Sequence, residues 1–183
     1  MVAVDKVVAK LKGFLFYPLL FKKFGKGSFL INPIQVLNPQ FISIGTNVRI
    51  RNHIRIEAIS SKRIPDLQIG NNCNIEQNVH IICSGTVHIG NNCSIGARSS
   101  IVDTDHPFSN LDGKKIGEQL NDVAKSVRIG DGCFLGIGCM ILPNVILGEG
   151  CVVGANAVVP AGTYPDRSVI AGIPARVLRL YYK

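Results

Sequence analysis

Residues 129–164 read IGDGCF, LGIGCM, ILPNVI, LGEGCV, VGANAV, VPAGTY when they are cut into blocks of six. The first place of every block is aliphatic, the second is often glycine and the fifth is small or branched. A period of six fits neither an amphipathic helix, which repeats about every 3.6 residues, nor one alternating strand. It fits a chain that turns after each block, so that three blocks close one coil and successive coils stack as parallel strands. The stretch therefore predicts a β-helix, which is a solenoid.

The same pattern recurs before this stretch, over residues 44–57, 69–86 and 89–106. We therefore expect one β-helix over residues 27–164. Residues 107–126 lack the six-residue phase, and a long insertion in a compact domain is usually functional or disordered. A basic helical segment over residues 1–26 and a C-terminal extension over residues 165–183 complete the expected domain organisation.

The repeat resembles that of the left-handed β-helix acyltransferases, the family that holds galactoside, maltose and xenobiotic acetyltransferases. The resemblance implies an all-β fold, a left-handed parallel β-helix. The left hand rests on the resemblance alone, because the general rule for parallel crossovers favours the right hand. It also implies acetyl-CoA as the acyl donor, no metal, and a homotrimer with active sites between subunits.

His106 differs in its setting from the other three histidines, which fall at outward places of ordinary blocks. It ends the block IVDTDH, follows two aspartates and stands at the root of the insertion. The residues alone leave a plain loop-starting turn open. In the family that this chain resembles, a histidine at this point is the catalytic base. Acyl transfer from a thioester needs such a group, because the acceptor must lose a proton as it attacks, and an imidazole can accept one at physiological pH.

Three acidic residues are candidates for binding the acceptor. Asp103 and Asp105 could fix the imidazole tautomer or bind a sugar hydroxyl, or they could only cap a turn. Glu76 matches a polar acceptor-binding place in the sugar acetyltransferases, where asparagine is usual. This departure leaves the nature of the acceptor open.

The resemblance places the donor along the late coils, where small corner residues let the pantetheine arm approach the backbone. The matching residues are Gly136, Gly138, Gly154 and Ala155. The segment VIAGIPARVLR (residues 169–179) resembles the family's exit segment, in which basic residues meet the CoA phosphates. Arg176 and Arg179 are the matching cations, and a guanidinium suits a phosphate.

The six cysteines favour a reducing compartment. Five of them occupy the inward fifth place of a block, and parallel side chains on stacked coils do not face each other as a disulfide requires. We expect buried, reduced thiols, and hence a cytoplasmic protein. The N-terminus also lacks the pattern of a signal peptide.

The net charge of +8 is concentrated at the N-terminus, where residues 1–26 hold six lysines and one aspartate. Two interpretations of this segment stay open. It could be a helix that caps the open end of the solenoid and hides its apolar face there. It could also be an interfacial segment that makes peripheral contact with the inner face of a membrane. The solenoid carries no nucleic-acid-binding motif, so no nucleic acid partner is expected.

These features together favour an acetyl-CoA-dependent O-acetyltransferase that acts on a sugar hydroxyl. The basic, aromatic N-terminus resembles those of enzymes of cell-surface polysaccharide synthesis. Two alternatives are a non-catalytic solenoid that binds a partner and a metal-dependent hydratase of the same fold. The hydratase needs three histidines around zinc, and no second histidine lies near His106 in the sequence.

Overall fold

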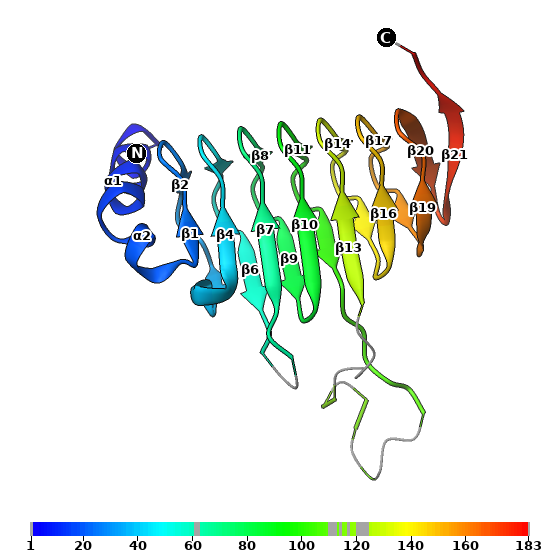
Figure 1. The fold of residues 1–183 in the computed structure, drawn as a ribbon, viewed down its shortest axis with the longest axis horizontal. Helices are drawn as coiled ribbons and strands as arrows, with labels where there is room; N and C mark the ends of the chain where they lie inside the picture. Colours follow the sequence, from blue (N-terminus) through cyan, green and yellow to red (C-terminus); the bar gives the residue numbers. More distant parts are fainter. Residues whose placement is uncertain are drawn as a thin grey trace.

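The protein is a rod built from stacked triangular coils, as a computed structural model shows. The structure describes residues 2–60, 63–109, 113, 115–116, 118–119 and 125–182. Two short helices lie at one end of the rod and the C-terminal hairpin lies at the other (Figure 1). The segment that follows β12 leaves the coil midway along the rod (Figure 1).

Three parallel sheets form the faces of the rod, and the chain visits them in turn. The first sheet contains β1 (Lys23–Phe24), β4 (Ile42–Ile44), β7 (Asp66–Ile69), β10 (Thr86–Ile89), β13 (Ser126–Ile129), β16 (Val145–Leu147) and β19 (Gly162–Tyr164). The second contains β2 (Phe29–Leu30), β5 (Arg49–Ile50), β8 (Asn74–Ile75), β11 (Ser94–Ile95), β14 (Phe134–Leu135), β17 (Val152–Val153), β20 (Ser168–Gly172) and β21 (Ala175–Leu180). The third contains β3 (Gln35–Leu37), β6 (Arg55–Ala58), β9 (His80–Cys83), β12 (Ser100–Val102), β15 (Met140–Ile141) and β18 (Val158–Val159).

The register of the late coils follows the six-residue repeat. Ile129 pairs with Leu147, which lies 18 residues later in the chain, so three blocks close one coil. The aliphatic first place of each block points inward and is buried, as Leu135 and Val153 are. The predicted fold, a left-handed parallel β-helix, is confirmed. Burial of this aliphatic column is the main stabilising contribution, at about 25 cal/mol for each Å² of apolar surface removed from water.

The coil is longer at both ends than the sequence predicts. Strand β1 lies inside the expected helical segment and already pairs with β4. At the other end β20 continues the second sheet in parallel with β17, and only β21 turns back antiparallel on β20. The six-residue pattern does not predict these two end strands, because the segments beside them do not follow its phase.

Helix α1 (Val2–Leu15) lies along β2 and contacts it through its small residues. Ala9 is buried against Phe29 and Ile31. A Cβ atom on Gly13 would lie 2.5 Å from the carbonyl oxygen of Ser28, so only glycine allows this close approach. The expectation that a capping helix hides its apolar face is therefore wrong. The large apolar residues of α1 are exposed instead: Val4, Val7, Val8, Leu11, Phe14 and Leu15.

Helix α2 (Tyr17–Leu20) is attached to the coil by an aromatic cluster. The ring centroids of Tyr17 and Phe24 are 5.2 Å apart, and those of Phe21 and Phe24 are 5.1 Å apart. Leu19, at the opposite side, remains 82% exposed. No helix in the described part of the chain is long and apolar enough to cross a membrane.

The predicted burial of the six cysteines is confirmed: all six side chains are buried, and each thiol is free. Cys73, Cys93, Cys133 and Cys151 stack on successive coils. Each of these four thiols donates a hydrogen bond to a carbonyl oxygen one coil later, such as that of Gly90 at 3.1 Å from Cys73 Sγ. Burial raises the pKa of the Cys83 and Cys139 thiols, which keeps both protonated.

Candidate active site

His106 lies beyond the end of β12, at the corner where the chain passes from the third sheet toward the first. Its side chain is exposed, and Nδ1 lies 2.7 Å from the carbonyl oxygen of Gln119. A carbonyl oxygen only accepts hydrogen bonds, so in the neutral ring Nδ1 carries the proton. In this tautomer the lone pair is on Nε2, which is the state that a general base requires.

An ion pair connects the two ends of the insertion. Lys125 Nζ bonds to Asp105 Oδ2, which joins the residue before His106 to the last residue before β13. Together with the Gln119 contact, this pair fixes the path of the chain on both sides of the imidazole. The described partner of His106 is therefore a backbone carbonyl, whereas Asp105 binds a lysine.

Asp103 caps the corner of the preceding coil. Its carboxylate accepts hydrogen bonds from the backbone N–H of Ser84 at 2.7 Å and of Gly85 at 2.8 Å. Its residue surface is 1% exposed. Burial raises the pKa of this carboxyl, and the two N–H donors act in the opposite direction. This geometry matches the turn-capping alternative, because both oxygens are occupied by the chain itself.

The glycines expected to bind the donor form a column at a different corner, between the second and third sheets. Gly136 N donates to Val153 O and Gly154 N donates to Ile170 O, so the two glycines lie in the same place on successive coils. A Cβ atom on Gly136 would lie 2.6 Å from the nitrogen of Ala155. Gly136 is buried, Gly138 and Gly154 are half-buried and Ala155 is exposed. At Gly136 and Gly154 this corner therefore exposes no side chain beyond the backbone, which would let an extended ligand arm approach closely.

Glu76 belongs to the same column, since its N–H donates to Ile95 O and that of Gly96 donates to Leu135 O. Its carboxylate lies 3.3 Å from Arg51 Nε, one coil earlier. Sequence reasoning missed Arg51 and Gly96. Both follow the inward aliphatic residue of a block, the place that Glu76, Gly136 and Gly154 also occupy, so the six-residue phase could have found them.

The column ends beside the C-terminal hairpin. Val153 is in register with Ile170. Ala171 therefore occupies, one coil later, the place that Gly154 occupies in the column. Ala171 is in turn in register with Arg176 on β21, and Val169 with Arg179. Both arginines are exposed. Arg176 thus lies at the end of the column, and Arg179 lies farther along β21.

The two groups of candidate residues occupy different corners of one subunit. His106, Asp103 and Asp105 lie between the third and first sheets, and the column lies between the second and third. Two grooves of about 940 and 620 Å³ lie on the described part of the chain, and the lining of each includes neither His106 nor Gly136. Phe134, Ile137 and Met140 stay exposed around the column. Within one subunit, the structure does not bring these two groups of candidate residues together.

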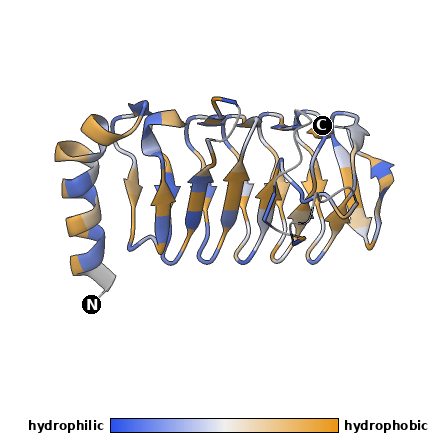
Figure 2. Ribbon diagram, turned by 90° about the horizontal axis from the view of Figure 1, so that it is seen from below, coloured by the Kyte–Doolittle hydropathy of each residue, from blue (hydrophilic) through white to orange (hydrophobic). Residues whose placement is uncertain are grey.

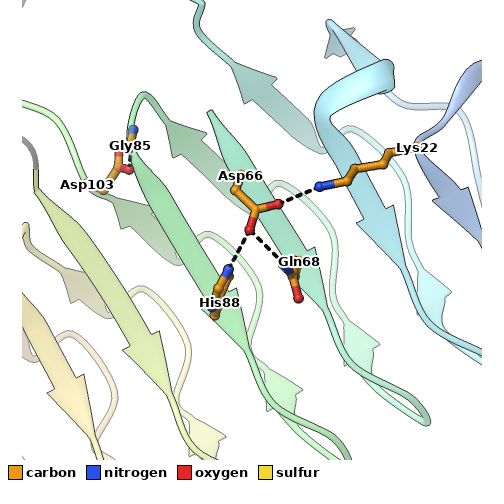
Figure 3. A network of polar contacts seen from close by, with 6 residues as sticks. All are labelled: Lys22, Asp66, Gln68, Gly85, His88 and Asp103. Atoms are coloured by element: carbon orange, nitrogen blue, oxygen red, sulfur yellow. Dashed lines mark hydrogen bonds and ion pairs between the residues drawn. The ribbon is translucent and has the colours of Figure 1, made fainter. Parts of the chain in front are cut away.

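The other outward histidines make polar contacts of their own. His88 Nε2 lies 2.9 Å from Asp66 Oδ2, and the same carboxylate accepts from Lys22 and Gln68 (Figure 3). His80 lies 3.8 Å from Glu57, and burial lowers the pKa of its ring. These two histidines link neighbouring strands and are partly buried. Among the described residues, no group of three His, Cys, Asp or Glu side chains could hold a metal ion.

Comparison with known proteins places these features in a family. Residues 126–161 match the bacterial transferase hexapeptide model, which describes six repeats, and residues 86–102 match the hexapeptide repeat of succinyl-transferase. The putative lipopolysaccharide biosynthesis O-acetyl transferase WbbJ of Escherichia coli (strain K12) is 31% identical over 154 residues, which cover 81% of this chain and 76% of that protein. The chain belongs to the hexapeptide-repeat acyltransferases.

Solved structures of other hexapeptide-repeat acyltransferases share the fold. AntD, an N-acyltransferase from Bacillus cereus crystallised with dTDP and 3-hydroxybutyryl-CoA, has a TM-score of 0.74 and 24% identity, covering 90% of this chain and 85% of its own. An acetyltransferase of Vibrio cholerae O1 biovar eltor in complex with acetyl coenzyme A has a TM-score of 0.62 and 20% identity, covering 100% of this chain and 89% of its own.

Proposed function

We propose that this hexapeptide-repeat acyltransferase transfers an acetyl group from acetyl-CoA to a sugar hydroxyl in cell-surface polysaccharide synthesis. The O-acetyl transferase named for lipopolysaccharide biosynthesis supports the sugar acceptor, because it is 31% identical to this chain over 76% of its own length. The observation that carries the reaction type is the contact of His106 Nδ1 with the Gln119 carbonyl oxygen, which favours the tautomer whose Nε2 can accept a proton.

The reaction is a direct transfer. Nε2 of His106 accepts the proton of the sugar hydroxyl as its oxygen attacks the thioester carbonyl. The carbon–sulfur bond then breaks, and the imidazolium returns the proton to the departing CoA thiolate. No cysteine acts as a nucleophile, in agreement with the burial of all six thiols.

The donor lies along the glycine column in this proposal. Gly136, Gly138, Gly154 and Ala155 present backbone to the pantetheine arm. Arg176, and Arg179 beyond it, meet the CoA phosphates through charge-assisted hydrogen bonds. Glu76 and Asp105 contact the acceptor.

The active enzyme is a homotrimer whose sites lie between subunits. The separation of His106 from the glycine column supports this assembly, because a neighbour can bring its own column to the His106 corner. The exposed apolar residues Phe134, Ile137 and Met140 around the column are suited to burial by a neighbouring subunit. The protein is cytoplasmic and contacts the inner membrane face peripherally through residues 1–26.

A thiol-release assay over sugars, oligosaccharides and antibiotics tests the activity. We expect acetyl-CoA-dependent thiol release with a sugar acceptor and an acetyl ester as the product. Release with an amine acceptor only, or with none, would contradict the proposal.

Subunit complementation tests the shared site. His106→Ala subunits and Gly154→Trp subunits are each expected to be inactive alone. Co-expression under two tags restores activity in mixed trimers if His106 and the glycine column of one site come from different subunits. Mixed trimers that stay inactive would show that each site belongs to one subunit.

A further inference from the structure

A groove of about 940 Å³ opens between α1 and the first coils, at the N-terminal end of the rod. Lys10 and Phe14 line it from α1, and Lys26 lines it from the turn that joins β1 to β2. Arg49 lines it from β5, where it is in register with Phe29 on one side and Asn74 on the other. The groove therefore requires both the helix and the coil.

The groove carries positive charge, and no acidic side chain among its lining residues, all of them described, neutralises it. Lys10, Lys26 and Arg49 come from three separate elements, and no carboxylate belongs to the lining. All three side chains are exposed, and in the described part of the chain none of them forms an ion pair. The remaining polar lining side chains, Ser28, Asn47, Asn72 and Asn74, are uncharged. Such a site suits an anion with several oxygens, such as a phosphate group.

The rim of the groove adjoins a large apolar surface. Phe14 lies in the lining and is 76% exposed, and Pro18 lines the same side. The exposed apolar face of α1 includes Val7, Leu11 and Phe14, which lie three or four residues apart, and Leu19 of α2 is exposed as well. Figure 2 shows α1 standing beside the N-terminal end of the rod with hydrophobic and hydrophilic residues on it.

We propose that this groove binds the phosphate headgroup of an anionic phospholipid while the apolar face of α1 and α2 enters the membrane interface. An anionic lipid is the occupant that matches both features, because its phosphate suits the three cations and its acyl region suits the adjoining apolar face. A second copy of this chain matches less well, because it would bring the same positive charge to the same surface. The proposal rests on the membrane contact proposed above and is independent of acyl transfer.

Two variants with equal loss of charge test the groove. The groove variant carries Lys10→Gln, Lys26→Gln and Arg49→Gln, and the control variant carries Lys6→Gln, Lys12→Gln and Lys23→Gln. All six side chains are exposed, and those of the control lie outside the groove lining. Co-sedimentation with vesicles of phosphatidylcholine and phosphatidylglycerol measures binding. If the triple groove variant has a lower melting temperature than the wild type, the single variant Arg49→Gln replaces it.

The groove variant is expected to bind these vesicles at least about tenfold more weakly than the control variant, since a tenfold change equals about 1.4 kcal/mol, roughly one charge-assisted hydrogen bond. If the two variants lose vesicle binding equally, the effect comes from general surface charge and the proposed lipid site is overturned. Vesicle binding by the groove variant that equals that of the wild type would overturn it as well.

A soluble probe separates headgroup recognition from membrane contact. Phe16, directly before α2, and Leu19 are both exposed. Phe16→Ser with Leu19→Ser should abolish vesicle binding yet keep the affinity for short-chain phosphatidylglycerol, measured by calorimetry. If the wild type binds inorganic phosphate but neither vesicles nor the short-chain lipid, the groove is a free-anion site and the lipid assignment is overturned. Association of the wild type into larger assemblies that this double variant abolishes, without vesicle binding, would assign the apolar face to a second copy.

Discussion

The carboxylate of Asp103 receives the backbone N–H of Gly85 at 2.8 Å, from the corner one coil earlier (Figure 3). The same carboxylate receives the N–H of Ser84, so one side chain satisfies two backbone donors at this corner. This corner lies directly beside the point where the insertion leaves the coil. Asp103 thereby fixes the position of the backbone just before His106.

Asp103→Ala should destabilise the fold. The substitution leaves two backbone donors without their acceptor, and the expected loss is about 2–3 kcal/mol in the free energy of unfolding. Urea denaturation measures it. Glu149→Ala, which removes an exposed corner carboxylate, should change the stability little. Equal stability of the two variants would contradict the capping role of Asp103.

The free energy of unfolding should depend on pH in the acid range because of Asp66. Partial burial raises the pKa of this carboxyl, but hydrogen bonds from His88, Lys22 and Gln68 outweigh burial and hold the pKa below the ordinary value of 3.8. The folded state therefore binds the proton less readily than the unfolded state. The resulting stability is present above the ordinary value and is lost as the pH falls through the lowered pKa.

Asp66→Asn should be less stable than the wild type near neutral pH, by about 1 kcal/mol or less because these contacts are open to solvent. The difference should disappear as the pH falls below 3.8. Urea midpoints measured from neutral to acid pH check the trend. A difference that stays constant at every pH would show that the ionised carboxylate does not stabilise the fold.

The buried cysteines should resist labelling in the native protein. A thiol reagent is expected to label few of the six under native conditions and all six after denaturation, because the thiols are buried in the coil. Mass spectrometry counts the labels. Rapid native labelling of most of the thiols would contradict the stacking of Cys73, Cys93, Cys133 and Cys151 inside the rod.

Arg176→Gln should weaken donor binding without changing the chemical step. The KM for acetyl-CoA is expected to rise about tenfold, the effect of losing one charge-assisted hydrogen bond, while kcat stays close to that of the wild type. S-acetylpantetheine lacks the phosphates, so its turnover should not respond to the substitution. Equal effects on the turnover of both donors would contradict a contact between Arg176 and the CoA phosphates.

The sequence predicts the parts of the molecule that repeat. The aliphatic first place of each block predicts the buried column, and its phase predicts the glycine column from Gly136 to Gly154. The same phase locates Gly96 and Arg51, which a residue-by-residue search overlooked. Periodicity predicts these features because every coil repeats the same local geometry.

Contacts made outside the repeat could not be predicted in this way. The capping by Asp103 and the contact of His106 with Gln119 depend on corners and an insertion with no periodic signal. The N-terminal helix shows the same limit. Its apolar stripe predicts an amphipathic helix, but only the close approach of Gly13 to Ser28 reveals that the small face meets the coil.

Turnover by a His106→Asn variant tests the account most directly. His53→Asn is the matched control, since His53 is exposed and has a φ of 59°, which asparagine readily adopts. With the sugar acceptor found in the thiol-release assay, we predict that His106→Asn lowers kcat at least about 100-fold, the usual effect of losing a positioned base. It should still bind CoA by calorimetry, and the His53→Asn variant should match the wild type. Near-normal turnover by the His106→Asn variant would contradict the assignment of His106 as the general base.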